Sequence, residues 1–431
     1  MRNKKIAILG GGLTGLTLAN LLQKKYSSVT VFEKDSIPGG LCRSFQFDNF
    51  TFDIGGHIIF SKDQEVLNFM INTIGRKNLF QKPCRDAIVY KNKLVNYPFE
   101  TDLAKLGKEE SFECLRNFII NNQKEPKDFH EWLHHTFGKS LAEKYFIPYN
   151  RKIWKIEPKE LDLGWVERIP KPSTEEMIKS CMGIPFESKI PRKNFFYPKK
   201  GGMQVLTNNL AKKVKDLRLN SEVKKIERIG KNWKVKTSLG QYEFNDIIST
   251  IPIFDLAKSL KVIPKNIKGA IDGLRYNSII IVCLGINKAK IINKTACYFP
   301  DEKILPSRVC FMNSFSPNNS PRRKSSLICE ITFRPKSDIS KMNDVTVLKN
   351  VVDGFEKVNL FKKRDIVLKK VLRFPYAYVV YDKNYTRNTK TIYSWLKKQK
   401  INTVGRFAEF QYLNMDACIR HAFDFVDKYS L

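Results

Sequence analysis

The chain has 431 residues, of which 42% are hydrophobic, and this length predicts two or three domains rather than one ordinary core. Its 76 Lys and Arg outnumber 43 Asp and Glu, which gives a formal net charge of +33. These basic residues are spread along the chain without a known nucleic-acid-binding motif. We therefore expect a basic surface that steers anionic ligands, and no specific nucleic-acid partner. Apolar runs are all well short of the roughly 18 residues of a membrane span, which predicts a cytoplasmic protein with no more than peripheral membrane association.

The nine cysteines fall singly along the chain. None forms a CxxC pair, so the sequence predicts neither a zinc site nor a thioredoxin-like site, and we expect no metal. An odd number of cysteines in a large chain favours reduced thiols and a reducing compartment. Cys283, inside the apolar run 279–284, is expected to be a core residue.

The N-terminal segment has the pattern of a dinucleotide-binding βαβ unit. Residues 6–9 are a short apolar run, typical of a buried parallel strand, and they lead directly into the glycine-rich segment 10–15. Leucines then recur at helical spacing up to Lys25, and a second, β-branched strand at 29–32 ends at Glu33. The glycine segment fits G-x-G-x-x-G with a strand before it, a helix after it and an acidic residue at the expected distance.

Each residue of this unit has a physical role. Gly10 permits the tight turn, Gly12 lets the backbone approach a pyrophosphate, and Gly15 lets the helix pack closely on the strand. The helix N-terminus offers N–H groups and a positive dipole end to the phosphates. Glu33 is expected to accept hydrogen bonds from the adenosine ribose hydroxyls.

A second glycine-rich loop, at residues 37–44, favours FAD over NAD because it is typical of the flavoprotein group that includes amine oxidases. In this loop Gly40 allows close backbone approach and Arg43 is expected to neutralise a phosphate. A β-meander that begins at Val223 closes near residue 252, where such folds return to the FAD.

Several further segments resemble, in the same order, those of UDP-galactopyranose mutases. The segment 52–61 resembles the loop that carries a histidine against the flavin, and 149–154 resembles the motif Y-N-x-K-x-W. The segment 165–170 resembles a mobile loop whose arginine holds the sugar diphosphate. In the C-terminal half the similar segments are 298–317, 374–378 and the closing motif 405–416.

The resemblance implies a set of site residues. The residues expected to be catalytic are Arg168, Arg308 and His57. The residues expected to bind the substrate are Asn150, Trp154, Tyr378 and Tyr412. The residues expected to bind FAD, together with those argued above from the two glycine loops, are Gly10, Gly12, Gly15, Glu33, Gly40, Arg43, Gly56, His57, Val223, Arg406, Asn414 and Met415.

The activity that the resemblance implies is the interconversion of UDP-galactopyranose and UDP-galactofuranose, a step in cell-surface polysaccharide biosynthesis. Reduced FAD would be the active form, with an external reductant such as NAD(P)H, and its N5 atom would attack the anomeric carbon and displace UDP. Two alternatives keep the fold: a mutase for a different nucleotide sugar, and an oxidoreductase like amine oxidases or protoporphyrinogen oxidase. The oxidoreductase would need a large apolar pocket, and a non-enzymatic binding role would be favoured by a protein without flavin.

The predicted fold class is mixed α/β, with a Rossmann-like FAD-binding domain, a helical insert and a β-sheet substrate domain. We expect the FAD-binding domain at residues 1–84, 195–260 and 400–431, the helical domain with the mobile loop at 100–194, and the β-sheet domain at 85–99 and 261–399. The Asn-, Ser- and Pro-rich segment 316–326 is expected to be an exposed loop. The oligomeric state is left open.

Overall fold

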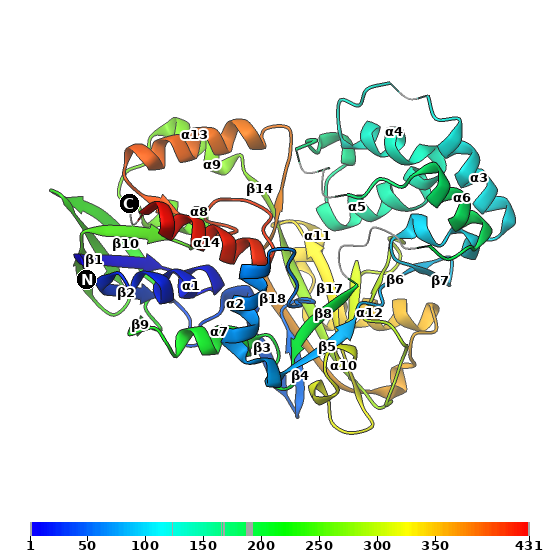
Figure 1. Cartoon of the computed structure of the whole chain (residues 1–431), viewed down its shortest axis with the longest axis horizontal. Coiled ribbons are helices and arrows are strands. Elements are labelled where there is room, and N and C mark those ends of the chain that lie inside the picture. The colour runs from blue at the N-terminus through cyan, green and yellow to red at the C-terminus, as the bar shows by residue number, and fades with distance from the viewer. Residues whose placement is uncertain (1, 123, 165, 167–168, 187–192, 430–431) are drawn as a thin grey trace.

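The computed structural model of the chain describes residues 2–122, 124–164, 166, 169–186 and 193–429. Its fold is mixed α/β, as predicted, with a parallel sheet, a large mostly antiparallel sheet and a separate group of helices. In Figure 1 the parallel sheet lies at the left, the large sheet at the lower centre and right, and the helices α3 to α6 at the upper right. Within the described residues, no helix combines the length and the apolar character needed to cross a membrane.

The parallel sheet is built around the first strand, as the sequence predicts. Ile6 and Ile8 are fully buried on one face, against helices α1 and α14, while Ala7 and Leu9 are fully buried on the other face, against a three-stranded sheet. A strand buried on both faces explains the continuous apolar run in the sequence. The strands, in sheet order, are β19 (Asn402–Thr403), β13 (Asp246–Ser249), β1 (Arg2–Leu9), β2 (Tyr26–Phe32) and β9 (Asp216–Arg218).

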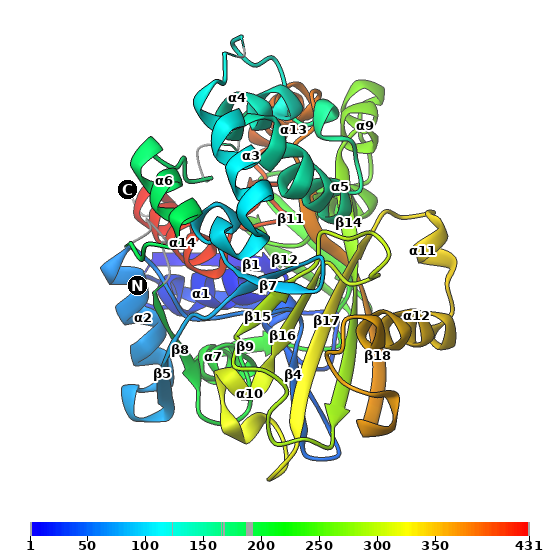
Figure 2. The ribbon, with the colours of Figure 1, turned by 90° about the vertical axis from the view of Figure 1, so that its right-hand side faces the viewer.

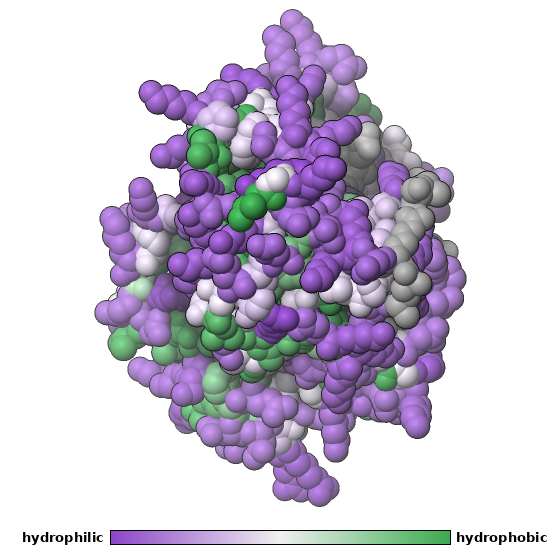
Figure 3. Space-filling model, turned by 90° about the vertical axis from the view of Figure 1, so that its left-hand side faces the viewer, coloured by the Kyte–Doolittle hydropathy of each residue, from purple (hydrophilic) through white to green (hydrophobic). Residues whose placement is uncertain are grey.

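The elements that cover the parallel sheet come from distant parts of the chain. One face carries α1 (Leu13–Leu22), α7 (Gln204–Ala211) and α14 (Met415–Tyr429). The other face carries β10 (Val223–Ile229), β11 (Asn232–Thr237) and β12 (Gln241–Phe244), next to α8 (Ile253–Ser259), α9 (Lys265–Asp272) and α13 (Tyr385–Lys398). Figure 3 views the molecule from the left-hand side of Figure 1, and hydrophilic side chains cover most of that face.

The large sheet is organised by two long strands that pair along most of their length. These are β14 (Arg275–Ile286) and β18 (Ile366–Val380), and Cys283 is fully buried on β14, which confirms the core position predicted for it. The strand order is β18-β14-β17-β16-β15-β6-β7, and the pairing of β15 with β6 is parallel. The other five strands are β17 (Ser325–Phe333), β16 (Arg308–Phe311), β15 (Ala296–Tyr298), β6 (Ala87–Tyr90) and β7 (Lys93–Asn96).

In Figure 2, helices α3, α4 and α5 of the helical group lie above strands β7 and β15 to β17. The helices of this group are α3 (Lys108–Ile119), α4 (Phe129–Leu141), α5 (Ile147–Trp154) and α6 (Thr174–Met182). Gly138 has a φ of 72° inside α4, and a Cβ there would lie 2.3 Å from the carbonyl oxygen of Asn117, so α3 and α4 cross too closely for a side chain. One π-helical turn (Ala142–Phe146) then leads into α5, and such turns mark strained, often functional, places in helices.

The remaining elements join these units. They are β3 (Ser44–Phe47), β4 (Phe50–Asp53), β5 (Leu79–Pro83), β8 (Asn194–Pro198), α2 (Gln64–Ile74), α10 (Met312–Phe315), α11 (Asp338–Lys341) and α12 (Asp344–Lys357). The expectation of an exposed loop at 316–326 is wrong in part. Ser316 and Asn319 are fully buried, because their side chains bond to the backbone of Lys199 and Met312. The exposed residues of the segment are Pro317, Asn318, Arg322 and Arg323.

Candidate active site

A cavity of about 1220 Å³ extends from the glycine-rich end of the parallel sheet to the large sheet. Its walls come from the turn after β1, the segment 54–63, strands β14 and β18 and the closing segment 406–420. Single small-molecule sites usually measure about 300–1,000 Å³. The cavity therefore has room for a dinucleotide and a second ligand beside it.

The glycine-rich turn has the geometry that the motif predicts. Gly10 has a φ of +106°, and a Cβ on Gly15 would lie 2.0 Å from the carbonyl oxygen of Gly10, so no side chain fits there. Helix α1 begins without a side-chain cap, which leaves the N–H groups of its first turn directed at the cavity. Gly12 and Gly40 approach each other across the turn: a Cβ on Gly12 would lie 4.0 Å from the Gly40 Cα.

Glu33 and Arg43 both line this end of the cavity. The Glu33 carboxylate accepts hydrogen bonds from the backbone N–H groups of Gly11 (2.8 Å) and Asp35 (3.0 Å), which fix it beside the glycine turn. The Arg43 guanidinium pairs with Asp35 at 2.9 Å and donates to the Gly40 carbonyl at 3.1 Å. The Asp35 carboxylate thus already neutralises part of the Arg43 charge, before any phosphate binds. Val223 also lines the cavity at this end.

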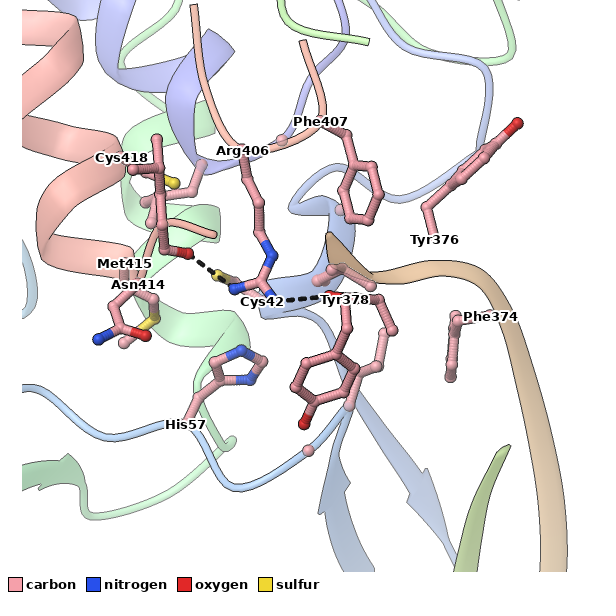
Figure 4. A pocket seen from close by; sticks show the side chains of 18 of the residues that line it. Cys42, His57, Phe374, Tyr376, Tyr378, Arg406, Phe407, Asn414, Met415 and Cys418 are labelled. Carbon is pink, nitrogen blue, oxygen red and sulfur yellow. Dashed lines mark hydrogen bonds between the residues drawn. The ribbon is translucent and has the colours of Figure 1, made fainter. Parts of the chain in front are cut away.

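The second end of the cavity brings together His57, Arg406, Asn414 and Met415, which come from the segment after β4 and from the closing segment (Figure 4). Arg406 is held by backbone carbonyls, because Nη1 donates to Leu413 at 2.7 Å and Nη2 to Ala377 at 2.5 Å. Burial, reinforced by the charges of Arg308 and Arg406, lowers the pKa of His57 to about 3. The imidazole is therefore neutral at physiological pH.

These residues fit a flavin. A Cβ on Gly56, just before His57, would lie 2.5 Å from Cys310 Sγ, so only glycine lets the backbone pass this close to β16. The space on the cavity side of Gly56 is thereby left for a ligand. In the described part of the chain, His57 Nδ1 and Arg406 Nε are among the buried side-chain atoms without a hydrogen-bond partner. Such atoms are costly unless a ligand satisfies them. A flat ring with carbonyl and N–H groups along its edge is the kind of molecule that would do so.

Arg308 lies next to this end, and it is paired with a residue that the sequence analysis missed. Glu330 stands opposite Arg308 in the register of β16 and β17. Its Oε1 accepts from Arg308 Nε at 2.9 Å, from Nη2 at 2.6 Å and from the Gly56 N–H at 3.0 Å. Burial works to lower the pKa of Arg308, but the Glu330 carboxylate more than offsets it, and the pKa lies well above its usual value.

Tyr378 and Tyr412 stack on each other in the cavity wall, with ring centroids 5.7 Å apart. The Tyr378 hydroxyl is 3.4 Å from Glu330 Oε2, and the Arg406 guanidinium lies 4.4 Å from the centre of the Tyr412 ring. Burial raises the pKa of Tyr378, which keeps its hydroxyl protonated and able to donate. Two hydroxyls and one arginine therefore face the space beside the flavin end.

Asn150 and Trp154 are placed differently from the predicted pocket lining. The Trp154 ring packs edge-on against Tyr378 and Tyr412, and its Nε1 donates to Asn150 Oδ1 at 3.0 Å. Among the described residues of α5, those that line the cavity are Tyr149 and Ile153, so Asn150 and Trp154 support the wall from behind. Arg168 lies outside the described residues.

Three features together define a dinucleotide-binding flavoprotein: the glycine turn, Glu33 at the end of β2, and the end of the cavity that is lined by His57 and Arg406. The described part of the chain contains no cluster of three or more His, Cys, Asp or Glu suited to a metal ion. The sequence model of the family "flavin containing amine oxidoreductase" matches residues 13–390, and the chain belongs to this family. That membership implies FAD as the cofactor.

Two curated relatives have names that describe different reactions. The dTDP-fucopyranose mutase of Escherichia coli is 24% identical over 176 residues, which are 38% of this chain and 46% of the mutase. The mitochondrial protoporphyrinogen oxidase of Nicotiana tabacum is 26% identical over 309 residues, which are 60% of each chain. The chain thus spans about half the length of the curated mutase that it matches.

A reduced UDP-galactopyranose mutase is similar over the whole fold. Its structure matches with a TM-score of 0.91, covering 99% of this chain and 95% of that chain, at 24% identity. The predicted resemblance to UDP-galactopyranose mutases is therefore confirmed for the fold. At this identity the likeness does not extend by itself to the substrate.

Proposed function

We propose that the chain is an FAD-dependent mutase that interconverts the pyranose and furanose forms of a nucleotide sugar, with UDP-galactose as the first substrate to test. The observation that carries the proposal is the cluster of Arg308, Tyr378 and Tyr412 directly beside the flavin end of the cavity. A leaving diphosphate needs cationic and hydroxyl donors around its oxygens. An amine substrate has no such anionic group, and a porphyrinogen carries carboxylates but no diphosphate leaving group.

In this mechanism the residues of the chain bind and orient the diphosphate. In the described part of the chain, Arg308 directs Nε and Nη2 to Glu330, which leaves Nη1 to donate to a diphosphate oxygen. The Tyr412 hydroxyl would donate to the same group, and the Tyr378 hydroxyl would exchange its bond to Glu330 Oε2 for one to the diphosphate. When bound in its reduced form, FAD would supply a nucleophile for the anomeric carbon, its N5 atom, with UDP as the leaving group. His57 is neutral and offers one donor or acceptor to the flavin edge, so it is not the source of a proton.

Three further parts of the proposal come from the family resemblance. Arg168 is proposed as a second cation on the diphosphate, NAD(P)H as the reductant, and cell-surface polysaccharide biosynthesis in the cytoplasm as the setting. A mutase for another sugar, such as the dTDP-linked sugar named in the E. coli relative, is the nearest variant of the proposal.

The test is to incubate the dithionite-reduced protein with UDP-galactofuranose and to separate the products by chromatography. We expect UDP-galactopyranose from the reduced protein and none from the oxidised protein. In the Arg308→Ala variant we expect turnover to fall by about 100-fold, because charge-assisted hydrogen bonds are worth roughly 1.5–3 kcal/mol. The matched control is Arg373→Ala, which removes an arginine paired with Asp344 at the surface and should leave turnover unchanged.

A second candidate is a flavin oxidoreductase, favoured by the 309-residue match to the tobacco protoporphyrinogen oxidase. Failure of conversion with several nucleotide sugars, together with oxygen consumption on a porphyrinogen or an amine, would select this candidate. Unchanged mutase turnover in Arg308→Ala would contradict the role given to the cation.

A further inference from the structure

Lys152 is a buried lysine that the proposed mechanism does not use. Burial lowers the pKa of its amine to about 7, while the carbonyl groups around it favour the protonated form. Lys152 lies on α5 between Asn150 and Trp154, and its side chain is only 4% exposed. Its ammonium donates to the backbone carbonyls of Phe299 and Asp301, both at 2.8 Å, and to that of Ile304. Among the described residues it forms no ion pair with a carboxylate. An ammonium has three donors, so three carbonyls satisfy it completely.

The three carbonyls belong to one short connection in the large sheet. They lie at residues 299–304 of the segment 299–307, which joins Tyr298 at the end of β15 to Arg308 at the start of β16. These two residues stand opposite each other in the β15–β16 pair, and both line the cavity. The ammonium therefore bonds to the connection that leads into β16, the strand on which Arg308 lies.

Helix α5 carries the facing part of the wall, Tyr149 and Ile153. Two strands hold the helix itself: Asn277 on β14 donates to the carbonyls of Ile153 (3.1 Å) and Trp154 (2.7 Å), and Thr332 on β17 donates to the Lys152 carbonyl (3.1 Å). Lys152 adds the bond from the helix to the β15–β16 connection. It thus joins two walls of the cavity that come from different parts of the chain.

We propose that Lys152 is a positioning residue that sets the distance between α5 and Arg308, and so the width of the cavity where a nucleoside diphosphate binds. The choice of ligand rests on the proposed function, whereas the positioning of the β15–β16 connection does not. Removal of the amine leaves the buried carbonyls of Phe299 and Ile304 without this donor, whereas the Asp301 carbonyl still accepts from the Ile304 N–H at 3.2 Å. Two unsatisfied buried carbonyls cost more than the loss of one ordinary hydrogen bond. The connection then moves to reach water, and Arg308 moves with it.

The test uses the FAD-bound protein and the variants Lys152→Ala and Lys152→Met. The control is Lys159→Met, an exposed lysine seven positions further along the same segment. In the first measurement, amide hydrogen exchange of residues 299–308 should be about 10- to 100-fold faster in both Lys152 variants, as expected when buried carbonyls lose their donor. In the second, the Kd for UDP should rise by a similar factor, with the FAD content unchanged.

Rescue by a small cation separates positioning from general damage. Ammonium chloride places a cation with N–H donors among the three carbonyls, and it should slow the exchange of residues 299–308 in Lys152→Ala and restore UDP binding. Tetramethylammonium chloride at the same ionic strength has no donor and should do neither.

Wild-type exchange rates in 299–308 for Lys152→Met, or damage that ammonium does not relieve in Lys152→Ala, would overturn the proposal. If the wild-type protein does not bind UDP, the nucleotide part of the proposed function fails. The exchange rates of residues 299–308 then still decide the positioning role.

Discussion

The pair of Arg308 and Glu330 can be tested by the substitution Glu330→Gln, which removes the charge and keeps the shape. Glu330 is 1% exposed and its Oε1 accepts two bonds from Arg308, at 2.6 Å and 2.9 Å. Breaking a buried pair by removing one partner costs about 3–5 kcal/mol, and the amide oxygen that remains reduces this to about 2–3 kcal/mol. The unfolding entropy of a 431-residue chain is about 0.9 kcal/mol/K, so we expect the melting temperature of the FAD-bound protein to fall by roughly 2–3 °C.

The same variant has a second expected result, which concerns the ligand. The guanidinium in Glu330→Gln lacks a counter-charge, and a diphosphate on Nη1 would supply one. UDP should therefore raise the melting temperature of the variant more than it raises that of the wild-type protein. Thermal scans that follow flavin fluorescence, with and without UDP, measure both effects.

The control for this experiment is Asp344→Asn, which breaks a surface pair with Arg373 at the same N–O distance of 2.9 Å as one of the buried bonds. Exposed pairs contribute about 0–1 kcal/mol, so its melting temperature should change little. A Glu330→Gln variant that melts like the wild type would refute the energetic reasoning. Equal shifts by UDP in both proteins would refute the contact between Arg308 and the diphosphate.

Three further predictions concern the pH dependence, the cofactor and the substrate. Burial raises the pKa of Glu100 from 4.5 to about 7, so ionisation of Glu100 between these two pH values weakens the fold. In urea unfolding, Glu100→Gln should be more stable than wild type by about 2–3 kcal/mol at pH 8 and equal to it near pH 4.5. A stability difference that does not change with pH would contradict this. Gly15→Ala should yield protein without the FAD absorbance, because its Cβ would lie 2.0 Å from the Gly10 carbonyl oxygen; Gly269→Ala, with nothing within 4 Å, should retain FAD, and equal FAD content in the two would refute the packing argument. Tyr412→Phe should weaken UDP binding about 10-fold by calorimetry with FAD unchanged, since a hydrogen bond to a charged group is worth roughly 1.5–3 kcal/mol; Tyr393→Phe, whose hydroxyl donates to the Ala408 carbonyl, should bind UDP normally.

The cofactor end could be predicted because its signals are local in the sequence. The apolar run 6–9, the glycine turn and Glu33 lie within one βαβ unit, and the structure has each at the place that the motif requires. The closing segment, with Arg406 and Met415, was found through the family resemblance, because its position depends on the folding of the whole chain. The roles of these residues, and the division into three domains, stay predictions.

The residues that were missed depend on the register of strands or on backbone atoms. Glu330 is the one acid within the apolar segment 325–333, and its partner Arg308 lies on another strand, so the pair exists only through the β16–β17 register. That isolated acid is the signal that could have identified it. The acceptors of Lys152 are carbonyl groups, which every residue possesses, so no residue type indicates them. For the segment 316–326, composition predicted exposure, while side-chain bonds to distant backbone decide the burial of Asn319.

The order of strands in the parallel sheet has a consequence for synthesis on the ribosome. Strand β1 is made first, yet its neighbour β13 begins at residue 246 and the edge strand β19 at residue 402. At roughly 5–20 residues per second, about 20–80 s pass before β19 exists. Until β13 has been made, after about 12–50 s at this rate, one side of β1 has unpaired N–H and C=O groups, which favour association with other chains. Because Arg406 is predicted to contact the flavin, we expect flavin retention to report that the chain has been made and has folded at least as far as this residue.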